Sequence, residues 1–182
     1  MTAVQIAFFL QLQQRNLSSR VLILRPTLEL ATRLKLDPLC DLPLAGQPIA
    51  DWCVRDFKCG RIAYLMFSNT VSLFSFVTPR RGVTNAKSLR TTFATAIHQN
   101  LDRVEHGQQH ASGILAALTD CQFSRCYDRS VISSINDLMQ MTKVHLEYGD
   151  TVAMITPRLN QTPMSLLNMD HPARRFAGLS VI

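Results

Sequence analysis

The sequence lacks the short motifs that mark common catalytic and cofactor sites. Its seven glycines are scattered, and neither GxGxxG nor GxxxxGK occurs, so no glycine-rich phosphate loop is predicted. No GxSxG segment is present to position a hydrolase nucleophile. Four aspartates, Asp51, Asp56, Asp102 and Asp120, stand apart and predict no paired-carboxylate metal site. An enzymatic function is therefore weakly supported; we assign no catalytic residue and expect no cofactor.

Lysine is also scarce. The chain has 19 basic residues against 13 acidic ones, a formal charge of +6, and all but four of the basic residues are arginine. The planar guanidinium group binds phosphate and carboxylate through paired hydrogen bonds, so this bias favours an anionic partner. A codon-biased genome would produce the same excess. The charge permits a weak attraction to nucleic acid without requiring it.

No hydrophobic run reaches the length of a membrane span. The apolar residues 6–10 are followed by Gln11, Gln13 and Gln14, and no basic segment precedes them. The five cysteines are an odd number without a repeated spacing, which is a poor basis for a disulfide framework. They are Cys40, Cys53, Cys59, Cys121 and Cys126. We expect a soluble cytoplasmic protein with reduced thiols and no membrane association.

Metal binding is not predicted. His106 and His110 are four residues apart, but Gly107 lies between them and no HExxH pattern is present, so surface histidines near a helix end are expected. The cysteine pairs 53/59 and 121/126 fall on predicted strands, with spacings wider than those of most zinc knuckles. Half-buried strand cysteines are the simpler interpretation.

A length of 182 residues fits one domain with a sizeable core, and 47% hydrophobic with 18% charged residues is an ordinary globular balance. We predict an N-terminal extension at 1–20, a single domain at 21–170 and a C-terminal tail at 171–182.

The clearest local prediction is a β-meander over about 52–77. Three runs rich in β-branched and aromatic residues, 52–58, 62–68 and 71–77, are separated by turns at Gly60 and Asn69. A further strand is predicted at 21–26, and Thr27 is a suitable N-cap for a helix that follows it.

Helical periodicity dominates the second half. The pattern predicts a helix capped by Asn85 or Thr84 and ended by Gly107, and others at 109–119 and 130–149. A strand at 121–128 and short helices up to 168 complete the prediction. The fold class is α+β: one domain with a mostly antiparallel sheet of four to five strands, packed on one face against helices.

A basic segment between residues 79 and 90 contains no acidic residue. Its charges would bind a phosphate backbone or an acidic protein surface. An exposed loop and helix start is the alternative interpretation. The nucleic-acid-binding candidates are Arg80, Arg81, Lys87 and Arg90.

The stretch DRSVISSINDL, 128–138, is unusually polar for the start of an amphipathic helix. Asp128 is a suitable N-cap, and the amides of the first helical turn attract anions. Anion- or partner-binding candidates are Arg129, Ser130, Ser134, Asn136 and Asp137. The alternative, which we favour, is that the inner polar residues tether the LNQTPM turn at 159–164.

DRSVISSINDL and LNQTPM, together with LMFSN and LFSFV of the meander, resemble a bacterial family of domains of unknown function. Some of its members carry the names of plasmid-borne open reading frames. The resemblance covers about 20–168; Cys59-Gly60-Arg61 departs from it, since basic residues are expected at that turn. It implies a cytoplasmic α+β domain tied to mobile or accessory genes and supplies no catalytic residues.

Three hypotheses follow. The first is a non-enzymatic binding or regulatory module, with a protein partner, linked to mobile-element or defence genes. The second is a nucleic-acid-binding protein that uses the basic segment. The third is an enzyme that acts on an anionic substrate at the 129–137 helix.

Overall fold

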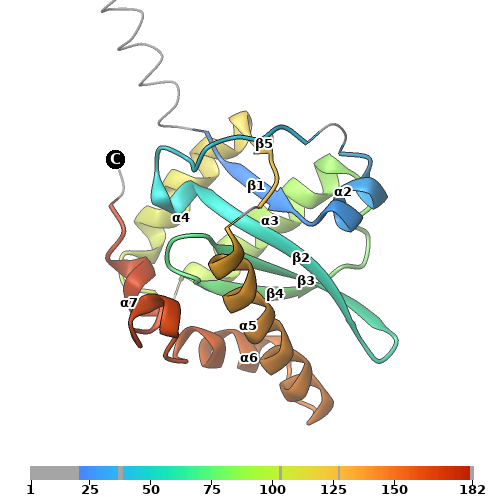
Figure 1. Ribbon diagram of the computed structural model, residues 1–182, viewed down its shortest axis with the longest axis vertical. Coiled ribbons are helices and arrows are strands. Elements are labelled where there is room, and N and C mark those ends of the chain that lie inside the picture. Colours follow the sequence, from blue (N-terminus) through green and yellow to red (C-terminus); the bar gives the residue numbers. More distant parts are fainter. Residues whose placement is uncertain (1–20, 37–38, 103, 127, 181–182) are drawn as a thin grey trace, which may run out of the picture.

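The computed structural model describes residues 21–36, 39–102, 104–126 and 128–180 (Figure 1). The predicted extension at 1–20 lies outside the described residues. A five-stranded sheet in the order β4-β3-β2-β1-β5 forms the centre of the described part. Its strands are β1 (Ile23–Pro26), β2 (Asp51–Cys59), β3 (Ile62–Asn69), β4 (Ser75–Pro79) and β5 (Gln122–Phe123).

The sheet is mixed. Strands β2, β3 and β4 are antiparallel neighbours, whereas β1 runs parallel to both β2 and β5. The α+β class and the five strands are as predicted, and the parallel pairs correct the prediction of a mostly antiparallel sheet. The parallel arrangement arises because a helix and a long loop carry the chain from β1 to β2 across the sheet. Of the described residues in the strand predicted at 121–128, Gln122 and Phe123 form β5, and Ser124 forms an isolated bridge with Cys40.

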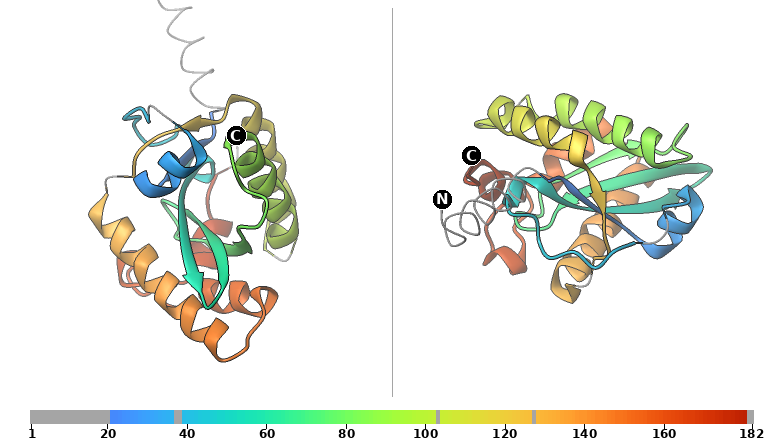
Figure 2. Two further views of the ribbon diagram at one scale, coloured as in Figure 1. Left: turned by 90° about the vertical axis from the view of Figure 1, so that its right-hand side faces the viewer. Right: turned by 90° about the horizontal axis from the view of Figure 1, so that it is seen from above.

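Helices cover both faces of the sheet, so the prediction of one covered face is wrong. Figure 2 shows α3 and α4 on one side and α5 and α6 on the other. The near-continuous apolar run of β3 reflects this, since a strand covered on both faces has no polar side. The helices are α2 (Leu28–Leu34), α3 (Ala86–Leu101), α4 (Gly107–Ala117), α5 (Arg129–Glu147), α6 (Val152–Asn160) and α7 (Pro172–Ala177). Short 3-10 turns are η1 (Pro48–Ala50), η2 (Leu118–Asp120) and η3 (Ser165–Leu167).

The larger core lies under α3, α4 and α7 and is centred on Trp52. Its ring lies 5.4 Å from Phe76, 5.4 Å from Phe93 and 5.7 Å from Phe176, between ring centroids. Phe176 belongs to α7, in the segment that we predicted to be a C-terminal tail, and it is fully buried. Residues 172–177 are therefore part of the packed domain.

The smaller core lies on the other face of the sheet. Met66 and Val77, which alternate with the residues that face Trp52, pack there against Ile135 and Leu138 of α5 and against α6. The two-residue period of the strands thus divides the apolar side chains between two cores.

The predicted helix caps at three positions are confirmed. The side chain of Thr27 accepts a hydrogen bond from the Leu30 amide, Asn85 forms a capping box with Ser88, and Asp128 caps α5.

Strand β4 begins later than predicted. The amides of Val71 and Ser72 donate to the Asn69 side chain, and Leu73 has a φ of 58°. Asparagine side chains favour such local turns over a continued ladder. The predicted antiparallel meander is confirmed, and Gly60 turns with φ 56°. The prediction of a tight turn at Asn69 is wrong, because residues 70–74 form a loop.

Gly107 does not end α3, which stops at Leu101; it opens α4. A Cβ atom at this position would lie 1.8 Å from the carbonyl oxygen of Leu101. The glycine thus allows the backbones of two consecutive helices to approach closely. In the sequence alone, such a glycine looks the same as one that ends a helix.

The outer edge of β4 is closed by one side chain of α6. The Ser75 amide donates to Asn160 Oδ1 at 2.8 Å, and Asn160 Nδ2 donates to the Ser75 carbonyl at 2.7 Å. Asn160 is 3% exposed and bonds also to the Thr156 carbonyl. Its amide thus takes the place of a neighbouring strand at an edge that would otherwise be open to pairing.

We expect Asn160→Ala to lower the free energy of unfolding by about 2–4 kcal/mol, because it leaves the buried amide and carbonyl of Ser75 unpaired. Urea denaturation measures the loss. Gln161→Ala, at the exposed neighbouring position, should change stability by less than about 0.5 kcal/mol. Equal losses in the two variants would contradict this role of Asn160.

Candidate functional site

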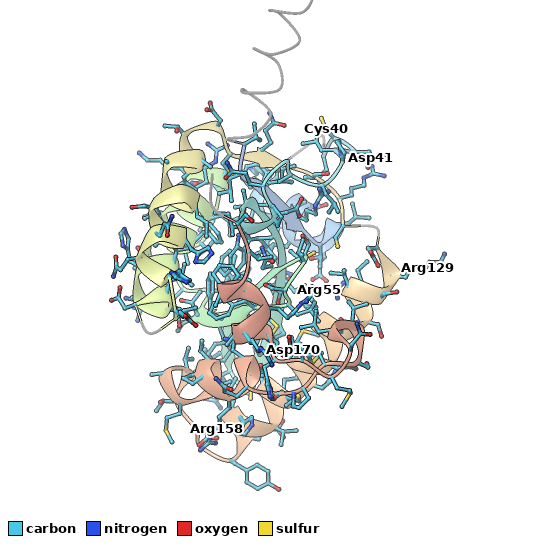
Figure 3. All side chains as sticks on the ribbon, turned by 90° about the vertical axis from the view of Figure 1, so that its left-hand side faces the viewer. Cys40, Asp41, Arg55, Arg129, Arg158 and Asp170 are labelled. Atoms are coloured by element: carbon cyan, nitrogen blue, oxygen red, sulfur yellow. The ribbon has the colours of Figure 1, made fainter. Side chains whose placement is uncertain are left out.

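The amides at the start of α5 already have an acceptor within the chain. Those of Ser130 and Val131 donate to Asp128 Oδ1 at 2.9 and 3.2 Å, and the Ser134 hydroxyl donates to the Ser130 carbonyl at 3.0 Å. An anion at this helix end would compete with the Asp128 carboxylate. Arg129 is exposed, and Figure 3 shows it pointing away from the body of the protein.

The remaining polar residues of α5 are not gathered into one site. Asn136 Oδ1 accepts a hydrogen bond from Arg55 Nη1 of β2 at 2.6 Å, whereas Asp137 is exposed. In the described part of the chain, no hydrogen bond joins Ser134, Asn136 or Asp137 to residues 159–164. Within 159–164, Asn160 is the residue that fastens the segment to the fold, and it binds β4. The favoured interpretation, in which polar residues of α5 tether this segment, therefore named the wrong residues.

The basic segment 79–90 divides between two places. Arg80 and Arg81 follow β4 and line an open groove of about 850 Å³, where they meet Arg33 from α2 and Arg61 from the β2–β3 turn. Lys87 and Arg90 lie on α3 beside a separate, shallow depression. Of the four residues that we grouped because they are close in sequence, Arg80 and Arg81 line the groove, and Lys87 and Arg90 do not.

The groove, which we call the arginine groove, is lined by Arg33, Arg61, Arg80 and Arg81 together with apolar residues such as Tyr64 and Val152, and no acidic side chain is among the described residues that line it. Arg33 is neutralised by ion pairs with Glu29, at 2.6 Å, and Asp56. The other three arginines form no ion pair with any described residue. Their charge remains available to a ligand.

Arg80 carries a second sign of incomplete pairing. Its Nε atom is buried and has no hydrogen-bond partner in the described part of the protein. Buried donors of this kind are rare because each forfeits the hydrogen bond that it would make to water. Arg90 Nε is buried and without a partner among the described residues in the same way, so this feature by itself does not indicate a ligand.

Arg90 has a structural role. Its Nη2 atom donates to the Cys121 carbonyl at 3.0 Å, and its guanidinium group stacks 5.2 Å from the Phe123 ring centroid. These contacts fasten α3 to the segment that forms β5, which makes Arg90 a poor candidate for a nucleic-acid contact.

A buried ion pair joins β1 to the start of β2. Arg25 Nε and Nη2 donate to the two carboxylate oxygens of Asp51 at 2.7 and 2.8 Å, and the residues are 3% and 1% exposed. Arg25 Nη1 also donates to the Ser124 hydroxyl at 2.9 Å and to the Arg125 carbonyl at 2.8 Å. One side chain thus joins β1, β2 and the segment after β5.

Two thiols meet beside this ion pair. Cys53 Sγ, on β2, donates to Cys126 Sγ at 2.8 Å. From the sequence we considered Cys53 with Cys59 and Cys126 with Cys121, and we predicted half-buried cysteines on strands. No spacing pattern signals a pair separated by 73 positions, so only the fold brings them together.

His106 and His110 lie in different surroundings. His106 is exposed, whereas His110 is buried, contrary to the prediction, with its ring nitrogens near the carbonyls of His106 and Leu179. Among the described residues, no three His, Cys, Asp or Glu side chains gather closely enough to hold a metal ion. None of the described helices is both long and apolar enough to cross a membrane.

These features define a mixed-sheet α+β domain with helices on both faces and a basic groove at one end. The chain belongs to the family described as Domain of unknown function (DUF6933), whose model matches residues 23–175. The resemblance to a family of domains of unknown function is thus confirmed. A comparison with curated proteins finds no match, and neither does one with solved structures.

We expect Arg25→Met to lower the free energy of unfolding by about 3–5 kcal/mol, since it leaves the buried Asp51 carboxylate unpaired. Adding Asp51→Leu should recover part of the loss, because the double variant buries no charge. Chemical denaturation of the three proteins checks both effects.

The matched control is Arg158→Ala, which removes an arginine paired with Asp150 at the surface. It should cost at most about 1 kcal/mol. A double variant less stable than Arg25→Met alone would contradict the assignment of the loss to an unpaired buried charge.

Proposed function

We propose that this protein is a non-enzymatic binding module that takes an anionic partner in the arginine groove. The observation that carries the proposal is the convergence of Arg61, Arg80 and Arg81, from two separate segments, on one groove without ion-pair partners among the described residues. Unpaired arginines near one another repel, so the arrangement favours a ligand that neutralises them.

Nucleic acid is the partner class that this groove suits best. Guanidinium groups bind phosphate oxygens through paired hydrogen bonds, and a groove of about 850 Å³ that is open to solvent accommodates a continuous backbone. The formal charge of +6 adds a general attraction to polyanions. The proposed contacts are to phosphates rather than bases, so binding should depend little on sequence.

The two other hypotheses have less support. The proposed substrate site at 129–137 has its helix amides occupied by Asp128 and its polar residues dispersed. A protein partner with an acidic surface would use the same groove, and its gene would lie near this one. The resemblance supports a bacterial, cytoplasmic protein encoded among mobile-element or defence genes, which the gene neighbourhood tests.

We expect the double variant Arg80→Ala/Arg81→Ala to bind a labelled 20-nucleotide single strand about tenfold more weakly than the unaltered protein at low salt. The slope of log affinity against log salt should fall by about two, since two phosphate contacts are lost. Fluorescence anisotropy at several salt concentrations measures both quantities, with a duplex of the same sequence alongside.

The charge-matched control is Arg174→Ala/Arg175→Ala, an exposed pair of neighbouring arginines on α7, outside the groove. It should weaken binding by less than about threefold. The proposal fails if the unaltered protein does not bind at low salt, or if the two double variants lose affinity equally.

A further inference from the structure

The two thiols introduced above lie next to residues that the buried Arg25 side chain binds. Cys53 lies on β2, two residues after Asp51, and Cys126 follows the segment whose Ser124 hydroxyl and Arg125 carbonyl accept from Arg25. The sulfur atoms are 2.8 Å apart, and both cysteines are free thiols. A bond between them requires only a small approach of the sulfur atoms.

The pair opens onto a cavity of about 240 Å³. Cys126 is half-buried on its wall, and Cys53 is 2% exposed behind it. The cavity is lined by Arg25, Pro26, Thr27, Leu28, Cys53, Arg55, Arg125 and Cys126. Arg25 is neutralised by Asp51, and Arg125 forms an ion pair with Asp41 at 3.8 Å. Arg55 is therefore the lining arginine that has no ion pair with a described residue.

The thiols differ in acidity. The hydrogen bond that Cys53 donates lowers the pKa of Cys126 from its ordinary value, and Arg25 and Arg55 lower it further, against burial and Asp51, which raise it. The same hydrogen bond and burial raise the pKa of Cys53 well above its ordinary value. Thiolate character therefore gathers on the accessible sulfur and the proton on the enclosed one.

We propose that Cys126 and Cys53 form a reversible redox site for small anionic disulfides, with Cys126 as the attacking thiol and Cys53 as the resolving thiol. The site lies apart from the arginine groove and is independent of the function proposed for it. The charge of Arg55 on the cavity wall favours a disulfide that carries carboxylates.

The reaction is a pair of thiol–disulfide exchanges. The Cys126 thiolate attacks one sulfur of the disulfide RSSR, forms a mixed disulfide and expels RS⁻, which takes a proton from water. Cys53 then gives its proton to water and attacks Cys126 Sγ, and the second RS⁻ leaves and is protonated by water. Two cysteine thiols are oxidised to one intramolecular disulfide and RSSR is reduced to two RSH, so atoms and electrons balance.

Arg55 is a positioning residue for this site, and a hydrogen bond to Asn136 fixes the Arg55 side chain. Asn136 Oδ1 accepts from Arg55 Nη1 at 2.6 Å, which directs a guanidinium group from β2 to the space between the thiols and α5. The polar residue Asn136 thereby has a role in setting the charge beside Cys126.

The test uses the reduced full-length protein and oxidised glutathione. After quenching with iodoacetamide, mass spectrometry should show the loss of two hydrogen atoms without a retained glutathionyl group, and peptide mapping should show a Cys53–Cys126 bond. Cys53→Ala should retain one glutathionyl group on Cys126, because the resolving thiol is missing, whereas Cys126→Ala should form no adduct at Cys53.

The control variant is Cys40→Ala, which removes an exposed cysteine outside the cavity and should leave the Cys53–Cys126 bond unchanged. The peptide map of the unaltered protein decides the matter even if Cys53→Ala fails to fold. A bond between any other two cysteines, or adduct formation at Cys40 as fast as at Cys126, would overturn the proposal.

A pH profile separates the positioning role of Arg55 from a structural one. Arg55→Met should move the midpoint of Cys126 alkylation to higher pH by about one unit, since a positive charge no longer favours the thiolate. Arg158→Met removes a distant arginine and should leave the midpoint in place. An unchanged midpoint in Arg55→Met would remove Arg55 from the proposal.

Discussion

The buried ion pair of Arg25 and Asp51 is the interaction on which the arrangement of this protein depends. It crosses between β1 and β2, and the spare donors of Arg25 reach the carbonyls of Leu42 and Pro43 and the segment after β5. Asp51 Oδ2 also accepts from the Ala45 amide. Because a buried charge is tolerated only when its hydrogen bonds are completed, each of these segments is confined to one position. The parallel half of the sheet, the irregular segment 39–47 and the thiol pair are all placed by this constraint.

The division of the molecule into two cores follows from the same sheet. Residues that alternate along β2, β3 and β4 face Trp52 on one side and α5 with α6 on the other. The polar groups on the face that packs against α5 and α6 have hydrogen-bond partners. The pairs are Arg25 with Asp51, Arg55 with Asn136, and the hydroxyls of Ser68 and Ser75 at 2.7 Å. The candidate chemistry of the protein therefore lies at the margins of the smaller core, and the aromatic core supplies rigidity.

Much of the fold was predictable because it depends on neighbours in the sequence. The caps at Thr27, Asn85 and Asp128, the turn at Gly60 and the apolar stripe of α3 are set by contacts within a few residues. The errors occurred where a residue contacts another element of the fold. Gly107 makes room for the Leu101 carbonyl of the preceding helix. Asn69 Nδ2 donates to the carbonyls of Pro48 and Asp51, and Asn160 binds the edge of β4. The candidate sites show the same limit, since Arg80 and Arg81 were named but their neighbours Arg33 and Arg61 were not.

The amino-acid sequence alone determined the α+β class, the principal helix caps, the excess of positive charge and the likeness to a family of domains of unknown function. Only the tertiary structure decided which face each helix covers, which arginines share a groove and which cysteines meet. The physical reason is that periodicity and capping are local properties of the chain. Pairing of charges or thiols across 26 or 73 positions instead depends on how the sheet is assembled, and that assembly is governed by the burial of both faces.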